Sequence, residues 1–255
     1  MLPGFFVETL MTPEEFEAGW RRWHGQGVMA GWGLSFTRPE AWTRFHALPD
    51  SKEYLDTPAE MAIYLERAEA LIAWLFPDAM AAGFSVSTSE EVRGYPDWIR
   101  FVPLWITFLP FWTDRWRPFR LDLIEGKRRQ HKWEADGLKP GFVWSEERAF
   151  NLPLDDEYLM RAYIGPGPAK SCRQKIFEDL AHEREFFIVW HAPDTGATFI
   201  PYHGGFDVFL ETADERDAVR EEFSDWLPVP GKGYPSHLDV MDESEAEQAS
   251  SPGSL

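Results

Sequence analysis

The last third of the chain contains the pattern that most restricts the fold: three short apolar segments, separated by turns and followed by a helix. The turns read Pro-Asp-Thr-Gly at 193–196 and Tyr-His-Gly-Gly at 202–205, and Thr212 or Asp214 can cap a helix that runs to Leu227. Such turn residues join strands that pair antiparallel. The predicted strands are 186–190, 197–201 and 206–210. The pattern therefore predicts an α+β fold in which an antiparallel meander packs against helices.

Two segments in the first third share a helix-start pattern of threonine, proline, any residue and glutamate. The threonine caps the first turn, the proline fits the first helical position, and the glutamate reaches back to complete a capping box. The pattern predicts one helix from Pro13 to about Trp23 and a second that begins at Pro58 and ends before Pro77. The second helix has an apolar stripe at helical spacing, formed by Met61, Tyr64, Leu65, Ala68, Leu71, Ile72 and Leu75.

Further elements are predicted between and after these helices. The remaining predicted strands are Val28–Thr37, Gly83–Thr88, Trp98–Leu109 and Trp116–Ile124. Prolines in the last two restrict them to sheet edges or bulges. A helix is predicted from Ser171 to about His182, whereas the segment 154–164 fits a helix and a strand equally well.

The size and composition predict one domain with an aromatic-rich core. The chain has 255 residues, of which 44% are hydrophobic, and it contains 13 tryptophans and 20 phenylalanines. Aromatic side chains dominate cores and interfaces, so an aromatic-rich binding face is the alternative use. The predicted domain covers residues 1–235. Residues 236–255 are acidic and contain no aromatic residue, which is typical of a disordered tail; mimicry of nucleic-acid charge is the alternative.

The net charge of −18 argues against binding to nucleic acids or anionic membranes, because phosphate groups require a basic surface. Such a surface attracts basic partners and speeds their encounter. A single cysteine, Cys172, allows no disulfide within the chain, and the N-terminus lacks the pattern of a secretory signal. The most apolar stretch, 98–112, is too short and too interrupted to span a bilayer. We therefore expect a cytoplasmic protein.

No motif in the sequence assembles a catalytic, metal or cofactor site. His182-Glu183 begins a zinc-protease pattern, but Phe186 stands where the second histidine is required. There is no nucleophile elbow, and two prolines remove backbone donors from the glycine-rich segment 165–168. We therefore expect no enzyme, no metal and no cofactor. The alternative is a hydrolase that uses carboxylates in an aromatic cleft, which would require two acids facing each other.

A basic, aromatic-rich segment covers residues 112–133. It contains Arg115, Arg117, Arg120, Lys127, Arg128, Arg129 and Lys132 between Trp112, Trp116, Phe119 and Trp133. Such a mixture can bind single-stranded nucleic acid. In a chain of this negative charge, pairing with the protein's own acids is the favoured interpretation, and nucleic-acid binding is a third hypothesis.

The C-terminal pattern also resembles a known family. The residues that carry the resemblance lie within 186–227, and they are the apolar strand Phe-Phe-Ile-Val-Trp, the turn Pro-Tyr-His-Gly-Gly, the strand Phe-Asp-Val-Phe-Leu and the ending Phe-Ser-Asp-Trp-Leu. They are similar to the bacterial family catalogued as domain of unknown function 3885, in which an aspartate is usual where this chain has His203. The strand at 32–36 and the helix that ends at 75–77 are also similar to that family.

The resemblance implies a cytoplasmic immunity protein that binds and neutralises an Rhs-type toxin by protein–protein contact. The partner would be the cognate toxin, which could be basic and so complement the acidic surface. No catalytic residue follows from the resemblance. The candidate partner-binding residues are Tyr202, His203, Asp207, Trp112, Trp116 and Trp133. Tyr202 and Asp207 have a structural alternative, in which the first packs on a helix and the second stabilises the turn.

Overall fold

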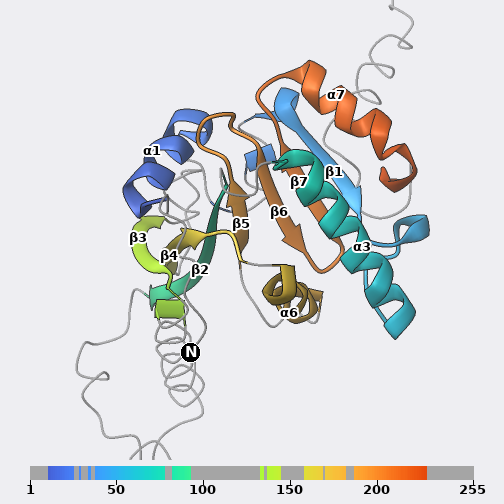
Figure 1. The fold of residues 1–255 in the computed structure, drawn as a ribbon, viewed down its shortest axis with the longest axis horizontal. Helices are drawn as coiled ribbons and strands as arrows, with labels where there is room; N and C mark the ends of the chain where they lie inside the picture. Colours follow the sequence, from blue (N-terminus) through green and yellow to red (C-terminus); the bar gives the residue numbers. More distant parts are fainter. Residues whose placement is uncertain are drawn as a thin grey trace, which may run out of the picture.

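A computed structural model shows the fold of the chain (Figure 1). The structure describes residues 11–25, 29, 34–35, 38–77, 82–92, 133–134, 137–144, 158–168, 170–181 and 187–228. The predicted strands 98–109 and 116–124, the basic part of 112–133 and the predicted tail 236–255 lie outside these residues.

Seven strands form one sheet in which every neighbouring pair is antiparallel. The order across the sheet is β1-β7-β6-β5-β2-β4-β3. The strands are β1 (Trp42–His46), β2 (Gly83–Val92), β3 (Lys139–Trp144), β4 (Tyr158–Pro166), β5 (Ile188–His191), β6 (Thr198–Tyr202) and β7 (Gly205–Phe209). The predicted α+β fold with an antiparallel meander is therefore confirmed, and the meander β5-β6-β7 lies inside a larger sheet.

Four α-helices pack against the sheet within the described part of the chain. They are α1 (Pro13–His24), α3 (Pro58–Leu75), α6 (Lys170–Ala181) and α7 (Ala213–Glu222). Helices α1, α3 and α7 each begin with a complete capping box, in which the N-cap threonine hydroxyl accepts the N–H of the glutamate three residues on. The local pattern therefore fixed these three starts.

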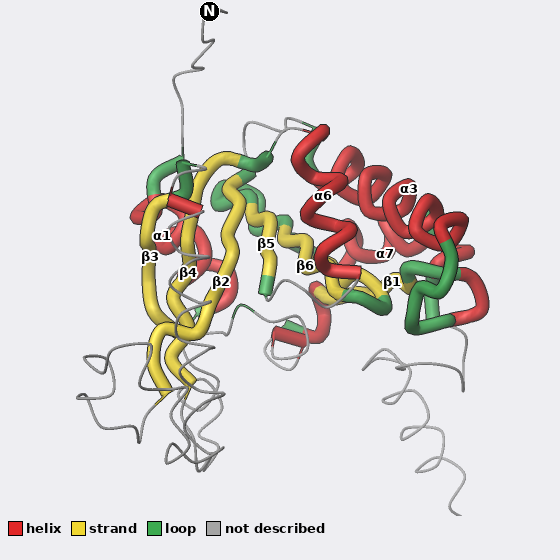
Figure 2. The backbone as a smooth tube through the Cα atoms, turned by 90° about the horizontal axis from the view of Figure 1, so that it is seen from below, coloured by secondary structure: helices red, strands yellow, loops and turns green. Residues whose placement is uncertain are grey.

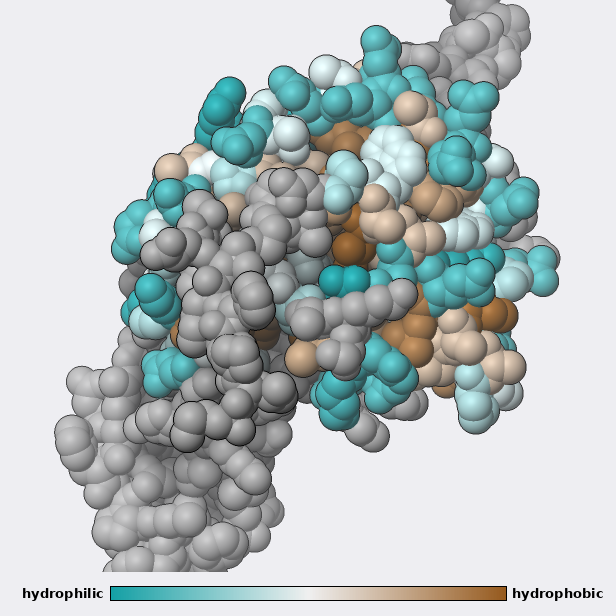
Figure 3. All heavy atoms as spheres, viewed as in Figure 1, coloured by the Kyte–Doolittle hydropathy of each residue, from teal (hydrophilic) through white to brown (hydrophobic). Residues whose placement is uncertain are grey.

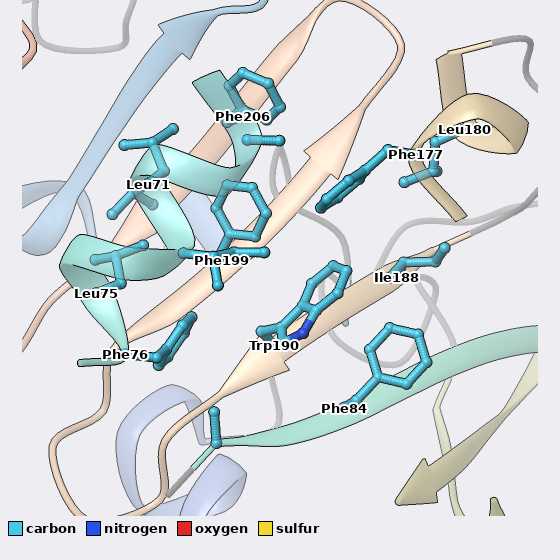
Figure 4. Packing of buried hydrophobic residues seen from close by; sticks show 14 of the residues in the cluster. Leu71, Leu75, Phe76, Phe84, Phe177, Leu180, Ile188, Trp190, Phe199 and Phe206 are labelled. Atoms are coloured by element: carbon cyan, nitrogen blue, oxygen red, sulfur yellow. The ribbon is translucent and has the colours of Figure 1, made fainter. Parts of the chain in front are cut away.

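Helices α3, α6 and α7 cover one face of the sheet and lie together in Figure 2. Successive side chains of a strand point to opposite faces, and on this face they are mostly aromatic. Figure 4 shows Trp190 of β5 between Phe84, Phe177 and Phe199, with ring centroids 4.8 to 5.7 Å apart. The aromatic-rich core is thus a confirmed prediction.

Helix α1 covers the other face of the sheet. Its residues Phe16 and Trp20 are buried in a second cluster with strand residues such as Phe209. The helix approaches the β5–β6 turn closely at Gly19, where a Cβ atom would overlap the ring of Pro193. The indole N–H of Trp23 donates to the carbonyl of Pro193 (2.7 Å), so α1 is docked on this turn by packing and by a hydrogen bond.

Two sequence predictions need correction. Leu34 and Ser35 are helical, although they lie in the predicted strand 28–37. Leu34 is buried under the second face of the sheet, so its apolar character serves packing and not strand pairing. The closing helix ends at Glu222 rather than Leu227, because Phe223 leaves the helical region (φ −112°, ψ 35°). A 3₁₀ turn then follows at Ser224–Trp226.

The other predictions within the described residues stand as follows. The segment 154–164, which fitted either element, contributes to strand β4. Strand β2 extends the predicted strand 83–88 to Val92. Strands β1 and β3 were not predicted. Strand β1 pairs at one edge of the sheet with β7, which is distant in sequence. Strand β3 pairs at the other edge with β4, and a β-bulge interrupts that pairing.

Candidate functional site

The turn between β6 and β7 lies against the loop that follows β1. Tyr202 and Gly205 pair at the end of the hairpin, and the N–H of Ala47 donates to the carbonyl of Gly204 (3.1 Å). A Cβ atom at Gly204 would lie 3.2 Å from Cγ of Glu53. A Cβ atom at Gly205 would overlap the backbone of β1. The two glycines thus allow the turn and the loop to approach each other closely.

Beneath this turn is a buried arginine site, formed by Trp42, Arg44, Tyr202 and Asp207. Arg44 donates to both carboxylate oxygens of Asp207 (2.9 and 3.0 Å), and the indole N–H of Trp42 donates to one of them (2.9 Å). The guanidinium lies 5.3 Å from the ring centroids of Trp42 and of Tyr202. The side chains of Arg44 and Asp207 are 11% and 3% exposed. A cation is therefore held against two aromatic rings and neutralised by a two-point ion pair.

Beside the buried arginine site, at the protein surface, is a surface site formed by Glu53, Tyr54 and His203. The rings of Tyr54 and His203 are stacked, with centroids 5.1 Å apart and planes inclined by 10°. Nε2 of His203 lies 3.3 Å from Oε1 of Glu53. Tyr54 is 54% exposed and is the exposed large hydrophobic residue of the described chain. The rings of Tyr202 and His203 lie nearly perpendicular, with centroids 5.9 Å apart and planes inclined by 82°, and this contact joins the two sites.

The structure brings three of the six predicted site residues together. Tyr202 and His203 lie at the turn, and Asp207 lies below them, where its carboxylate is occupied by Arg44 and Trp42. Asp207 thus stabilises the pairing of β7 with β1 and not the turn itself. Trp133 is 5% exposed and packs against Tyr163. Trp112 and Trp116 lie outside the described residues.

Sequence reasoning missed Arg44, Glu53 and Tyr54. The alternation of Trp42-Thr-Arg-Phe-His was a strand signal that could have placed Arg44 on one face with Trp42. No local signal could have paired that face with Asp207, which is 163 residues away along the chain. Glu53 and Tyr54 lie in a loop, where their positions depend on contacts with the hairpin.

A second polar cluster is buried between α1 and the meander. Nε2 of His24 and Nδ1 of His191 each lie 2.9 Å from the hydroxyl oxygen of Thr198. That hydroxyl donates to the carbonyl of Gly196 (3.0 Å), so both imidazoles must donate to its oxygen. Phe16, Trp20 and Phe209 contact these rings. The cluster is fixed in a buried, aromatic environment.

This environment keeps both imidazoles neutral. Burial, which is the largest cause, and the positive charge of Arg38 together lower the pKa of His191 from 6.5 to about 3, although a hydrogen bond between the protonated ring and the backbone of Gly19 opposes the shift. Burial lowers the pKa of His24 well below its usual value, and His191 and Arg38 act in the same direction. No group of three or more His, Cys, Asp or Glu side chains within the described ranges could hold a metal ion.

The outer surface of α7 is acidic. Both of its arginines are bound within the protein: Arg216 donates to the carbonyl of Glu40 (2.7 Å) and pairs with Asp217, and Arg220 donates to the hydroxyl of Thr43 (3.1 Å). The exposed acids are Glu211, Asp214, Glu215, Asp217, Glu221, Glu222 and Asp225. Hydrophilic side chains accordingly cover this part of the molecule at the upper right of Figure 3.

Arg67 of α3 links this acidic surface to the surroundings of the surface site. Its guanidinium donates to the carbonyl of His46 (2.8 Å) and lies 5.1 Å from the ring centroid of Trp226. His46 ends β1 and pairs with Gly205 of the hairpin. The buried side chain of Arg67 therefore connects the 3₁₀ turn that follows α7 with the β6–β7 hairpin.

Comparison with known proteins gives one match. Residues 31–229 match the family described as domain of unknown function (DUF3885), and they include all seven strands, α3, α6 and α7. No curated protein and no solved structure matches the chain. Within the described residues, no helix combines the length and the apolar composition that crossing a membrane requires. Since the match covers most of the sequence, the chain belongs to the DUF3885 family.

Proposed function

We propose that this protein binds a cognate toxin polypeptide of the Rhs type and neutralises it through protein–protein contact. The observation that carries the proposal is the surface site, where an exposed tyrosine is held against a histidine beside a carboxylate. Tyrosine is enriched among the residues that dominate binding energy at interfaces. Because the rings of Tyr54 and His203 are already stacked, little side-chain freedom would be lost on binding.

The acidic surface of α7 supports the same proposal. Seven exposed acids lie between Glu211 and Asp225, and the neighbouring arginines are used in contacts within the protein. Charge of one sign on a binding surface increases the rate of encounter with a partner of opposite sign. We therefore propose that the toxin is basic where it meets this surface. A cytoplasmic location is part of the proposal, since the toxin must be neutralised where it acts.

The test is to combine the purified protein with the product of the adjacent toxin gene. We expect a one-to-one complex, survival of cells that express both genes, and association that slows as salt is added. Glu221→Lys should slow association, whereas Glu14→Lys on α1, a matched change on the other side of the sheet, should slow it less. Absence of a complex together with absence of rescue would refute the proposal. The alternative, hydrolase activity, stays a prediction that a hydrolysis screen of the purified protein tests.

A further inference from the structure

Helix α3 has an outer face that lacks the charges found on α1 and α7. Five residues of α1 are exposed and four of them are charged, and α7 has six exposed residues, of which five are charged. Helix α3 also has five exposed residues, but only Glu66 among them carries a charge. A helix that stays in solvent normally has a polar face opposite its buried one. The outer face of α3 is therefore suited to contact with another protein segment.

The apolar residues of this face follow the spacing of a helix that packs against a second helix. Positions 59, 63, 66, 70 and 73 alternate in steps of four and three, so they form one line along the helix. Ile63 stays partly exposed although it packs against the core. Alanines along such a line let two helix axes approach to about 8 Å. The outer face of α3 is formed by Ala59, Ala62, Ile63, Glu66, Ala70 and Ala73.

Glu66 lies in the middle of the outer face and forms no ion pair within the described residues. The other two acids of α3 are already paired, because Glu60 binds Lys52 and Glu69 binds Arg173. Helix α7, whose exposed residues are mostly acidic, covers the same side of the sheet (Figure 2). The charge that remains near the outer face is therefore negative, and it complements a cationic partner.

This charge argues against a second copy of the chain as the occupant of the face. Helix α3 runs from Pro58 to Leu75, so Glu66 lies at its midpoint. Pairing of two α3 helices about a twofold axis, parallel or antiparallel, would place two Glu66 carboxylates together. Each copy would also carry a net charge of −18. Like charges placed opposite each other cost binding energy, whereas a helix with a cation at its centre would pair with Glu66.

We propose that the outer face of α3 binds an α-helix of the partner protein, with apolar residues along the contact and a lysine or arginine opposite Glu66. The inference rests on the proposed function for the identity of the partner. It adds the secondary structure and the chemistry of the recognised segment, whose contacts would recur at i, i+3, i+4 and i+7. The 18 residues of α3 span about 27 Å, which accommodates about five turns of the partner helix.

The first experiment uses two synthetic helical peptides of the same length as α3, with leucine and alanine along one stripe. One peptide has arginine at the centre of that stripe, and the other has glutamate there. Each is titrated into the full-length protein, and the NMR shifts of the methyl groups of Ala62, Ile63 and Ala73 are followed. We expect a saturable shift with the arginine peptide and a much weaker one with the glutamate peptide. Equal binding of the two peptides, or binding of neither, would overturn the inference.

Variants then separate the outer face from the net charge of the protein. Ala62→Arg and Ala73→Arg each place a bulky cation in the face, and arginine replaces alanine in an exposed helix at little cost to folding. Each should weaken binding of the arginine peptide by about tenfold or more, and Glu66→Gln should weaken it roughly two- to fivefold. The matched control is Ala18→Arg, because Ala18 is an exposed alanine of α1 on the other face of the sheet. An equal loss in the control would mean that only net charge matters, and the inference would fail.

Sedimentation of the free protein tests the other occupant. We expect no self-association through the outer face. A dimer that both Ala62→Arg and Ala73→Arg dissociate would mean that a second copy covers this face, which contradicts the inference.

The same variants distinguish the inference from the proposed function. If the wild-type protein binds the toxin and Ala62→Arg and Ala73→Arg bind it equally well, the toxin uses another surface, so the inference fails and the proposed function survives. If the wild-type protein does not bind the toxin, the proposed function fails, and the peptide titration still decides whether the outer face takes a basic helix.

Discussion

Replacing the two buried histidines should make the stability of the protein less sensitive to mild acid. His24 and His191 share the hydroxyl of Thr198 and are surrounded by aromatic rings. In the folded protein both stay neutral well below pH 6.5 because burial lowers the pKa of each. In the unfolded chain they bind protons with their ordinary pKa near 6.5. The unfolded state therefore takes up more protons, and stability falls as the pH falls below 6.5.

The size of the effect follows from the pKa of His191. With values of 6.5 unfolded and about 3 folded, this residue alone lowers the free energy of unfolding by about 2 kcal/mol between neutral pH and about pH 5. His24 adds a loss of the same sign, and its Nδ1, where a second proton would bind, has no hydrogen-bond partner among the described residues. His46, whose pKa burial also lowers, contributes in the same pH range. Most of the titration of the carboxylates falls at lower pH, and the comparison of slopes between the wild type and the histidine variant removes their shared contribution.

The assay is denaturant unfolding at several pH values from about 7 to 5, followed by tryptophan fluorescence. Trp20 is a suitable reporter, because its ring lies 4.4 Å from that of His24. The test variant combines His24→Gln with His191→Asn, since the amide nitrogens of these residues can replace the Nε2 and Nδ1 donors to Thr198. Its stability should be lower at neutral pH, but the slope against pH should be reduced. An unchanged slope would refute the reasoning, and His46→Gln measures the remaining contribution.

Three other variants test the ion pair of Asp207 with Arg44, the packing of α1 and the N-terminal cap of α7. Asp207→Ala should lower the free energy of unfolding by about 3–5 kcal/mol because Arg44 is left buried without its carboxylate; the double variant with Arg44→Met should recover part of this loss in denaturant titrations. Gly19→Ala should destabilise by about 1–3 kcal/mol through overlap with Pro193, although the same change in an exposed helix would stabilise, and a raised melting temperature would contradict it. Thr212→Ala should cost about 1 kcal/mol through loss of the α7 cap, and thermal unfolding that matches the wild type would contradict that value.

The elements predicted correctly are those whose signals are local. Thr12 and Thr57 each cap a helix with a glutamate three residues on, and both capping boxes form. The turn at 193–196 forms with Gly196 at a φ of 73°, a conformation that glycine adopts without strain. These features depend on a few neighbouring residues, and sequence spacing is sufficient to identify them.

The features that were missed depend on contacts between distant segments. The strand at Trp42–His46 shows only five residues of alternation, and its partner β7 follows more than 160 residues later. The ring contact between His24 and His191 likewise depends on where α1 packs on the sheet. The contact between Tyr54 and His203 depends on where the loop after β1 lies. Spacing in one sequence contains no measure of such distances, so the composition of the surface site could not be predicted.

The strand order has a consequence for how the protein is made. The edge strand β1 is synthesised early, yet its neighbour β7 is the last strand of the sheet, and α1 docks on the turn that precedes β6. A nascent chain that ends before residue 205 therefore lacks the strand that pairs with β1. It also lacks part of the sheet surface on which α1 packs. Contacts this remote in sequence slow folding and prolong exposure of apolar surface, so the apolar faces of β1 and α1 stay uncovered in a freshly translated copy until the last strand has left the ribosome.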